Sequence, residues 1–151
     1  MSGQGTDGVR IGKGSPVNDR ESGGIGDRRV AVATEGDAIR FSWGSITWLC
    51  SGDLQADAET TFGYVEIRPG MKNPKHLHPN SDEVLFLIEG ELDHSLGDTV
   101  HHLTAGMAIH IPRGVEHDAV NTSDKTARMV VSYPTPERQV VFSDDAMAGQ
   151  E

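Results

Sequence analysis

From Val30 onward, apolar and β-branched residues occur in short runs separated by glycine, proline, asparagine and aspartate. Five runs have the length and composition of β-strands, and they cover residues 45–50, 60–67, 84–88, 106–111 and 128–133. No window of a dozen residues shows helical apolar spacing that outweighs strand-like alternation. Short strands that recur at spacings of about ten residues indicate an all-β sandwich or barrel.

Residues 1–29 have a different composition. Eight of the 18 glycines fall within the first 26 residues, and the few apolar residues there are isolated from one another. Such a segment buries too little apolar surface to offset the entropy of ordering it. We therefore expect a disordered, glycine-rich tail over residues 1–29 and a single folded domain over residues 30–151, a size that suits one hydrophobic core.

The charge balance narrows the classes of partner. The chain has 23 acidic and 13 basic residues, for a net charge of −10. A domain this acidic repels phosphate backbones, so we expect no nucleic-acid partner. Cys50 is the single cysteine and cannot form an intramolecular disulfide. No apolar run reaches the ~20 residues of a membrane span, and the first 29 residues have no signal-peptide core. We expect a soluble, cytoplasmic protein.

All seven histidines lie in one window, residues 76–117. On a strand, His76 and His78 project from the same face, and two such imidazoles are half of a transition-metal site. Glu83 follows a polar stretch, residues 79–82, that we interpret as a hairpin returning the carboxylate toward the two histidines. His117 follows a second turn, residues 112–114, that brings a third imidazole back toward them.

Two longer motifs contain these residues. Residues 70–90, GMKNPKHLHPNSDEVLFLIEG, fit the pattern G-x5-H-x-H-x4-E-x6-G, and residues 106–121, GMAIHIPRGVEHDAVN, fit G-x5-P-x-G-x2-H-x3-N. These are the two cupin motifs, and the chain resembles a small single-domain cupin. The resemblance implies a double-stranded β-helix, or jelly-roll barrel, that forms a homodimer. It also implies one divalent metal near the barrel mouth, with ligands at His76, His78, Glu83 and His117.

Three imidazoles and one carboxylate suit Fe, Mn, Ni, Co or Zn, and ligand type alone does not choose among them. A six-coordinate ion held by four ligands keeps two open positions, as in catalytic rather than structural sites.

The complete set of three histidines and one glutamate resembles quercetinase-like cupins. The first hypothesis is therefore a dioxygenase acting on a small phenol, enol or β-dicarbonyl compound. The first alternative is a non-redox metal-dependent cupin: an isomerase, lyase, decarboxylase or polyketide cyclase. The second alternative is a non-enzymatic binder of a small molecule. Cupin sensors usually carry a DNA-binding domain, and residues 1–29 show no helix-turn-helix pattern.

Catalysis requires a proton-transfer group besides the ion. Tyr64 and Glu66 share strand parity, and we name them as catalytic candidates that point into the barrel, together with Glu83. Glu66 is suited to orient a ligand imidazole; the alternative is an exposed carboxylate at a sheet edge. Tyr133 is placed to close one end of the barrel.

The remaining histidines and the aromatic residues have structural interpretations. His94 shares the parity of Leu92 and Leu96 and is expected to face the interior. His101, His102 and His110 are expected at the surface. Trp43 and Trp48 are expected to serve packing or a subunit interface. The predicted apolar wall of the barrel consists of Phe62, Leu85, Leu87, Ile109, Met129 and Val131.

Overall fold

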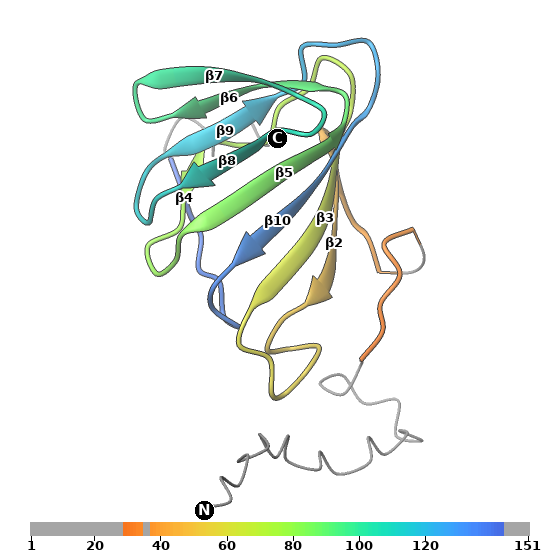
Figure 1. Ribbon diagram of the computed structural model, residues 1–151, viewed down its shortest axis with the longest axis vertical. Helices are drawn as coiled ribbons and strands as arrows, with labels where there is room; N and C mark the ends of the chain where they lie inside the picture. Colours follow the sequence, from red (N-terminus) through yellow and green to blue (C-terminus); the bar gives the residue numbers. More distant parts are fainter. Residues whose placement is uncertain (1–28, 35–36, 144–151) are drawn as a thin grey trace, which may run out of the picture.

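The structure, a computed structural model, describes residues 29–34 and 37–143, and all regular structure within these ranges is β-strand. The strands form two antiparallel sheets (Figure 1). The first sheet has the spatial order β1 (Ile39–Phe41), β2 (Gly44–Cys50), β3 (Thr61–Ile67), β10 (Ala127–Tyr133), β5 (Glu83–Glu89) and β8 (Ala108–Ile111). The second has the order β11 (Val141–Phe142), β4 (His76–Leu77), β9 (His117–Val120), β6 (Glu91–Leu96) and β7 (Thr99–Thr104).

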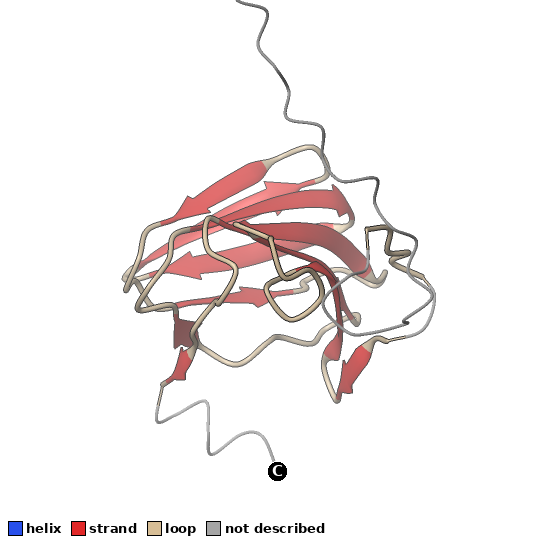
Figure 2. Ribbon diagram, turned by 90° about the horizontal axis from the view of Figure 1, so that it is seen from below, coloured by secondary structure: helices blue, strands red, loops and turns tan. Residues whose placement is uncertain are grey.

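Seen from below, the two sheets curve around a shared interior (Figure 2). Alternation along the strands fills this interior with apolar side chains, as period-two patterning requires. In β3 and β10 every second residue is buried, including Val65, Ile67, Met129 and Val131. The predicted all-β fold is confirmed, and the five strand-like runs correspond to β2, β3, β5, β8 and β10.

The predicted apolar wall is correct except at Phe62. Leu85, Leu87, Ile109, Met129 and Val131 are buried in the core, whereas Phe62 is half-buried on the other face of β3. The inward position next to it is Gly63, where an added Cβ would lie 2.8 Å from the Trp48 ring. The Trp48 side chain occupies the space beside Gly63, so the alternation that turns Gly63 inward turns Phe62 outward.

The hairpin predicted over residues 79–82 is wrong. The strands on either side, β4 and β5, belong to different sheets, so this stretch crosses from one sheet to the other. The turn over residues 112–114 makes a second such crossing, from β8 to β9. Glu83 pairs with Ile111, and His76 pairs with His117, so both crossings lie at the same end of the barrel.

Five glycines of the described chain have positive φ, the left-handed backbone conformation that tight turns favour. Gly114, in the second crossing, has φ +79°, and its N–H donates a hydrogen bond to the His78 carbonyl oxygen at 3.0 Å. This bond links the second crossing to His78, the residue at which the first crossing begins.

The predicted tail lies outside the described residues up to residue 28, so its disorder and the domain boundary stay predictions. Arg29 is exposed and donates two hydrogen bonds to the Asp57 carboxylate, at 2.8 and 2.9 Å. The hydrogen bond from Arg29 lowers the pKa of Asp57 below its usual value.

The described part of the chain contains no helix long and apolar enough to cross a membrane.

Candidate metal centre

Four side chains meet where the two crossings leave the sheets. His76 lies in β4, His78 directly after it, Glu83 begins β5 and His117 begins β9. One potential donor atom from each lies within 4.8 Å of the others, and all four residues are buried. The structure therefore brings together the four residues that the motifs implied as ligands, contributed by both sheets.

The histidine rings are held so that their Nε2 atoms face this meeting point. The Nδ1 atoms of His76, His78 and His117 lie 2.6, 2.8 and 2.9 Å from the carbonyl oxygens of residues 74, 139 and 115 respectively. A carbonyl oxygen only accepts, so each Nδ1 carries the hydrogen and each neutral ring has its lone pair on Nε2. Such backbone partners are the usual means of orienting metal-binding imidazoles.

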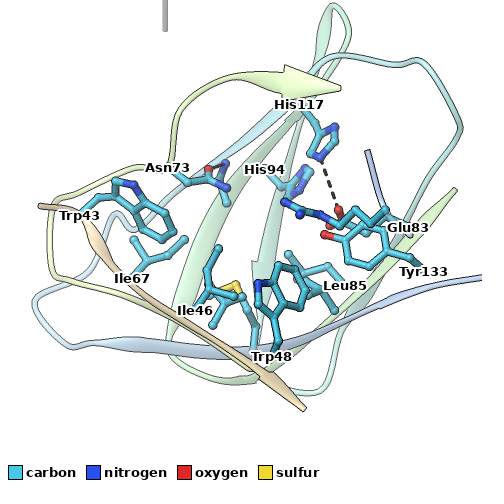
Figure 3. Close-up of a pocket in the computed structure, with 15 residues that line it drawn as sticks. Trp43, Ile46, Trp48, Ile67, Asn73, Glu83, Leu85, His94, His117 and Tyr133 are labelled. Carbon is cyan, nitrogen blue, oxygen red and sulfur yellow. Dashed lines mark hydrogen bonds and ion pairs between the residues drawn. The ribbon is translucent and has the colours of Figure 1, made fainter. Parts of the chain in front are cut away.

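The inward-facing atoms lack ordinary partners. His117 Nε2 lies 3.6 Å from Glu83 Oε1 (Figure 3), and His78 Nε2 lies 3.0 Å from the same oxygen. With lone pairs on both nitrogens these atoms are all acceptors, and they have no hydrogen-bond donor among the described residues. Buried acceptors at such distances repel unless a cation lies between them. The donor set fits one transition-metal ion, which the resemblance also implies.

Burial and mutual interaction set the charges of these groups. Burial, assisted by the neighbouring His117, lowers the pKa of His76 to about 3. Burial alone would raise the pKa of Glu83, but the neighbouring imidazoles of His117 and His78 outweigh it, so this pKa is lowered. Burial opposes the protonation of His117, yet the Glu83 carboxylate raises its pKa above the usual value. Glu83 is thus an anion, as a metal ligand must be.

A cavity of about 40 Å³ lies inside the barrel beside the donor set. By the volume that one water requires, it holds a few water molecules or a small chemical group. Its wall is mainly apolar and aromatic, and Figure 3 shows the labelled side chains around it. The polar side chains that line it are Asn73, Glu83, His94, His117, Tyr133 and Arg138.

Tyr133 and His94 are site residues that sequence reasoning did not assign to catalysis. Burial raises the pKa of Tyr133 well above its usual value, assisted by the Glu83 carboxylate and opposed by Arg138, so the hydroxyl stays neutral. Burial lowers the pKa of His94 to about 4, and its ring stacks on His117 at 5.8 Å. The sequence did indicate that both side chains face the interior. Tyr133 is an even number of residues from Met129 and Val131, and His94 is two residues from Leu92, so each lies on the same face of its strand as those apolar residues. For Arg138 the sequence offers no signal.

Tyr64 and Glu66, the predicted catalytic candidates, do not face the interior. They lie on the outer face of β3, while Val65 and Ile67 between and beyond them point into the core. The Tyr64 hydroxyl donates to Glu66 Oε1 at 2.8 Å, and the Arg128 guanidinium pairs with Glu66 and donates to Tyr64. The expectation that they point into the barrel is wrong. Side chains alternate between the two faces of β3, and the residues on its inner face are Thr61, Gly63, Val65 and Ile67.

The other predicted positions agree with the structure. His94 faces the interior, whereas His101, His102 and His110 are exposed. His102 bonds to Asp93 at 2.7 Å, and His110 to Asp82 at 3.1 Å.

The two tryptophans serve packing, as expected. The Trp43 ring stacks on Phe41, and the Trp48 ring lies against Tyr133 with 6.3 Å between centroids. Both tryptophans also line the cavity. Their role in a subunit interface stays a prediction.

Comparison with known proteins agrees with this geometry. The sequence profile of the family described as "Cupin domain" matches residues 63–133. "Polyketide synthase CurC" of Streptomyces cyaneus is 35% identical over 102 residues, or 68% of this chain and 66% of the relative. "Oxalate oxidase 1" of Hordeum vulgare is 30% identical over 95 residues, or 58% of this chain and 47% of the relative. The chain thus spans less than two thirds of the length of these curated relatives.

Solved structures share the fold. The formate complex of the Lactobacillus farciminis oxalate decarboxylase superposes with a TM-score of 0.67 and 19% identity, and the match covers 76% of this chain and 36% of that one. At this identity the similarity shows the fold alone.

Proposed function

This chain is a cupin-domain protein, and from that premise we propose that it is a metal-dependent enzyme acting on a small oxygenated organic molecule. The supporting observation is the convergence of three Nε2 atoms and the Glu83 carboxylate, with each imidazole fixed through its Nδ1. In this proposal His76, His78, Glu83 and His117 hold one divalent transition ion.

The bound ion would supply a Lewis acid that polarises an enol, phenol or carbonyl oxygen. The chain's own residues do the remaining work. Trp43, Trp48 and Leu85 form an apolar part of the cavity wall, and such low-dielectric surroundings strengthen electrostatic interactions inside the cavity. The small volume of the cavity suits the reacting group of a small substrate.

Proton transfer is the reaction class that these residues support best. His94 and Tyr133 line the cavity and offer an imidazole and a phenol group for proton transfer. His94 Nδ1 is buried and has no hydrogen-bond partner in the described part of the chain. We therefore favour a non-redox conversion that moves a proton next to a carbonyl, as in an isomerase, lyase, decarboxylase or cyclase. The relative named polyketide synthase supports an enolisable substrate.

A dioxygenase is the second candidate. It rests on the donor set of three histidines and one glutamate and on a relative named oxalate oxidase. The two reactions differ in their need for oxygen. Turnover of an enolic substrate under argon supports proton transfer, and oxygen uptake that parallels substrate loss supports the dioxygenase. Binding of enols without turnover of any compound in a broad panel would contradict an enzymatic role.

Metal analysis tests the proposed ligands. We expect about one transition ion per chain in the purified protein and its loss in His76→Ala and His117→Ala, because removing a ligand weakens metal binding strongly. His101→Ala, which removes an exposed imidazole, should retain the ion. Equal metal content in all three variants would disprove the ligand assignment.

A further inference from the structure

Arg138 enters the cavity from a segment outside both sequence motifs. It lies between β10 and β11, in a stretch whose backbone is tied to the barrel on both sides of it. The Asn80 side chain donates to the Glu137 carbonyl oxygen at 2.8 Å and accepts from the Gln139 N–H at 3.0 Å. The Gln139 carbonyl in turn orients His78. The same few residues therefore fix both Arg138 and a proposed metal ligand.

The Arg138 guanidinium lies against two aromatic rings. Its Cζ atom is 4.7 Å from the centroid of the Trp48 ring and 5.3 Å from that of Tyr133. Stacking of this kind holds the planar group in place and leaves its edge available for hydrogen bonding. Nε is buried and has no hydrogen-bond partner among the described residues. An unsatisfied buried donor of a charged group needs a partner.

The charges around the cavity show which partner would fit. Among the described residues that line it, Glu83 is the one carboxylate and Arg138 the one guanidinium, and they form no ion pair with each other. A divalent ion bound by Glu83 would keep one net positive charge, to which Arg138 adds a second. Two positive centres beside a weakly polar cavity destabilise each other unless an anion lies between them.

We propose that Arg138 binds an anionic oxygen group of the substrate, a carboxylate, where its guanidinium lines the cavity. The substrate class is then a small oxo acid with its carboxylate on Arg138 and its carbonyl or enol oxygen at the metal. A carboxylate matches the two-pronged geometry of guanidinium donors. This inference rests on the proposed function, since it takes the metal site as the second point of attachment.

Two probes of nearly equal size separate the contribution of Arg138. Acetoacetate and acetylacetone share a β-dicarbonyl unit, but acetoacetate carries a carboxylate where acetylacetone carries a methyl ketone. Their affinities for the zinc-loaded full chain are measured by calorimetry, with zinc content checked for every variant. The variants are Arg138→Gln, Arg138→Lys and the control Arg40→Gln, which removes the same charge from an exposed position in β1.

We expect the unaltered protein and Arg40→Gln to bind acetoacetate more tightly than acetylacetone. Arg138→Gln should weaken acetoacetate binding by about tenfold to a hundredfold, the usual range for a charge-assisted pair, and leave acetylacetone binding unchanged. Arg138→Lys should fall between, because lysine keeps the charge but lacks the fork of donors. It also tests the proposal if the glutamine variant fails to fold.

Equal losses for both probes in Arg138→Gln, or no difference between Arg138→Gln and Arg40→Gln, would overturn the role of Arg138 while leaving the metal site intact. Absence of zinc from the unaltered protein would instead overturn the proposed function. Zinc content therefore distinguishes the two failures.

Discussion

His76 and His117 are paired residues of two neighbouring antiparallel strands, and the centroids of their rings lie 4.3 Å apart. Residues 41 positions apart in the sequence thus become direct neighbours through the register of β4 and β9. Because side chains alternate between faces, a slip of one residue in this pairing would turn one imidazole away from the site. The register of these short strands is therefore part of the site, and the residues that hold it can be tested.

Gly114 is expected to affect both stability and metal binding. Its φ of +79° is unfavourable for other residues, so Gly114→Ala should destabilise the fold by about 1 kcal/mol and lower Tm by several degrees. Because its N–H bonds to the His78 carbonyl, the variant should also bind zinc more weakly. Gly70→Ala is the matched control, with φ +74° at the start of the first motif: it should lose similar stability and keep zinc affinity. Equal zinc affinity in both variants would contradict the link to His78.

Tyr133→Phe should retain the metal and lose activity. The substitution keeps the ring that packs against Trp48 and removes the neutral hydroxyl beside Glu83. We expect kcat to fall at least about tenfold, as for loss of a proton-transfer group, with metal content unchanged. Tyr64→Phe removes the same atom from the outer face of β3 and should leave kcat as it is. Equal kcat in the two variants would exclude Tyr133 from proton transfer.

Glu66→Gln tests the placement of the outer network. Glu66 pairs with Arg128 on a partly exposed surface, and such ion pairs contribute about 1 kcal/mol or less to the free energy of unfolding. We expect a small change in urea midpoint and no change in zinc content or turnover. If zinc binding or turnover were abolished, Glu66 would have to act through the site despite its outward position.

The metal-free protein should lose stability as the pH falls from about 7 to about 5. His94 has a pKa of about 4 in the folded chain and about 6.5 when unfolded, so the unfolded state binds the proton first. Protonation therefore favours unfolding below about pH 6.5, and at pH 5 this group alone destabilises the fold by about 2 kcal/mol. His76 acts in the same direction and His117 in the opposite one.

Urea unfolding at both pH values, in the presence of a chelator, measures the effect. His94→Asn should lose less stability than the unaltered protein over this range, because the variant lacks the contribution of His94. His76 and His117 titrate in both proteins, so their contributions cancel in the comparison. The exposed His101→Asn controls for removal of an imidazole. A pH dependence in His94→Asn as steep as that of the unaltered protein would show that His94 is not held neutral by burial.

The sequence alone was sufficient to predict five of the strands and to name the four proposed ligands. Alternation of apolar residues is a local property, so β2, β3, β5, β8 and β10 were predictable within a few residues. The glycine and proline spacing of the two motifs, together with resemblance to cupins, placed His76, His78, Glu83 and His117 in one site.

Tertiary structure decided what surrounds that site. The sequence shows which residues of a strand share a face, but which face points to the core depends on the side that the other sheet covers. For this reason Tyr64 and Glu66 were predicted to point inward although they lie on the outer face of β3. The segment over residues 79–82 has the composition of a hairpin, and only the pairing of β4 with β9 and of β5 with β10 makes it a crossing between sheets. Arg138 reaches the cavity because its segment is tied to Asn80, a contact that joins residues far apart in sequence. Local patterns determine strands and motifs, but contacts between distant segments determine which side chains share a cavity.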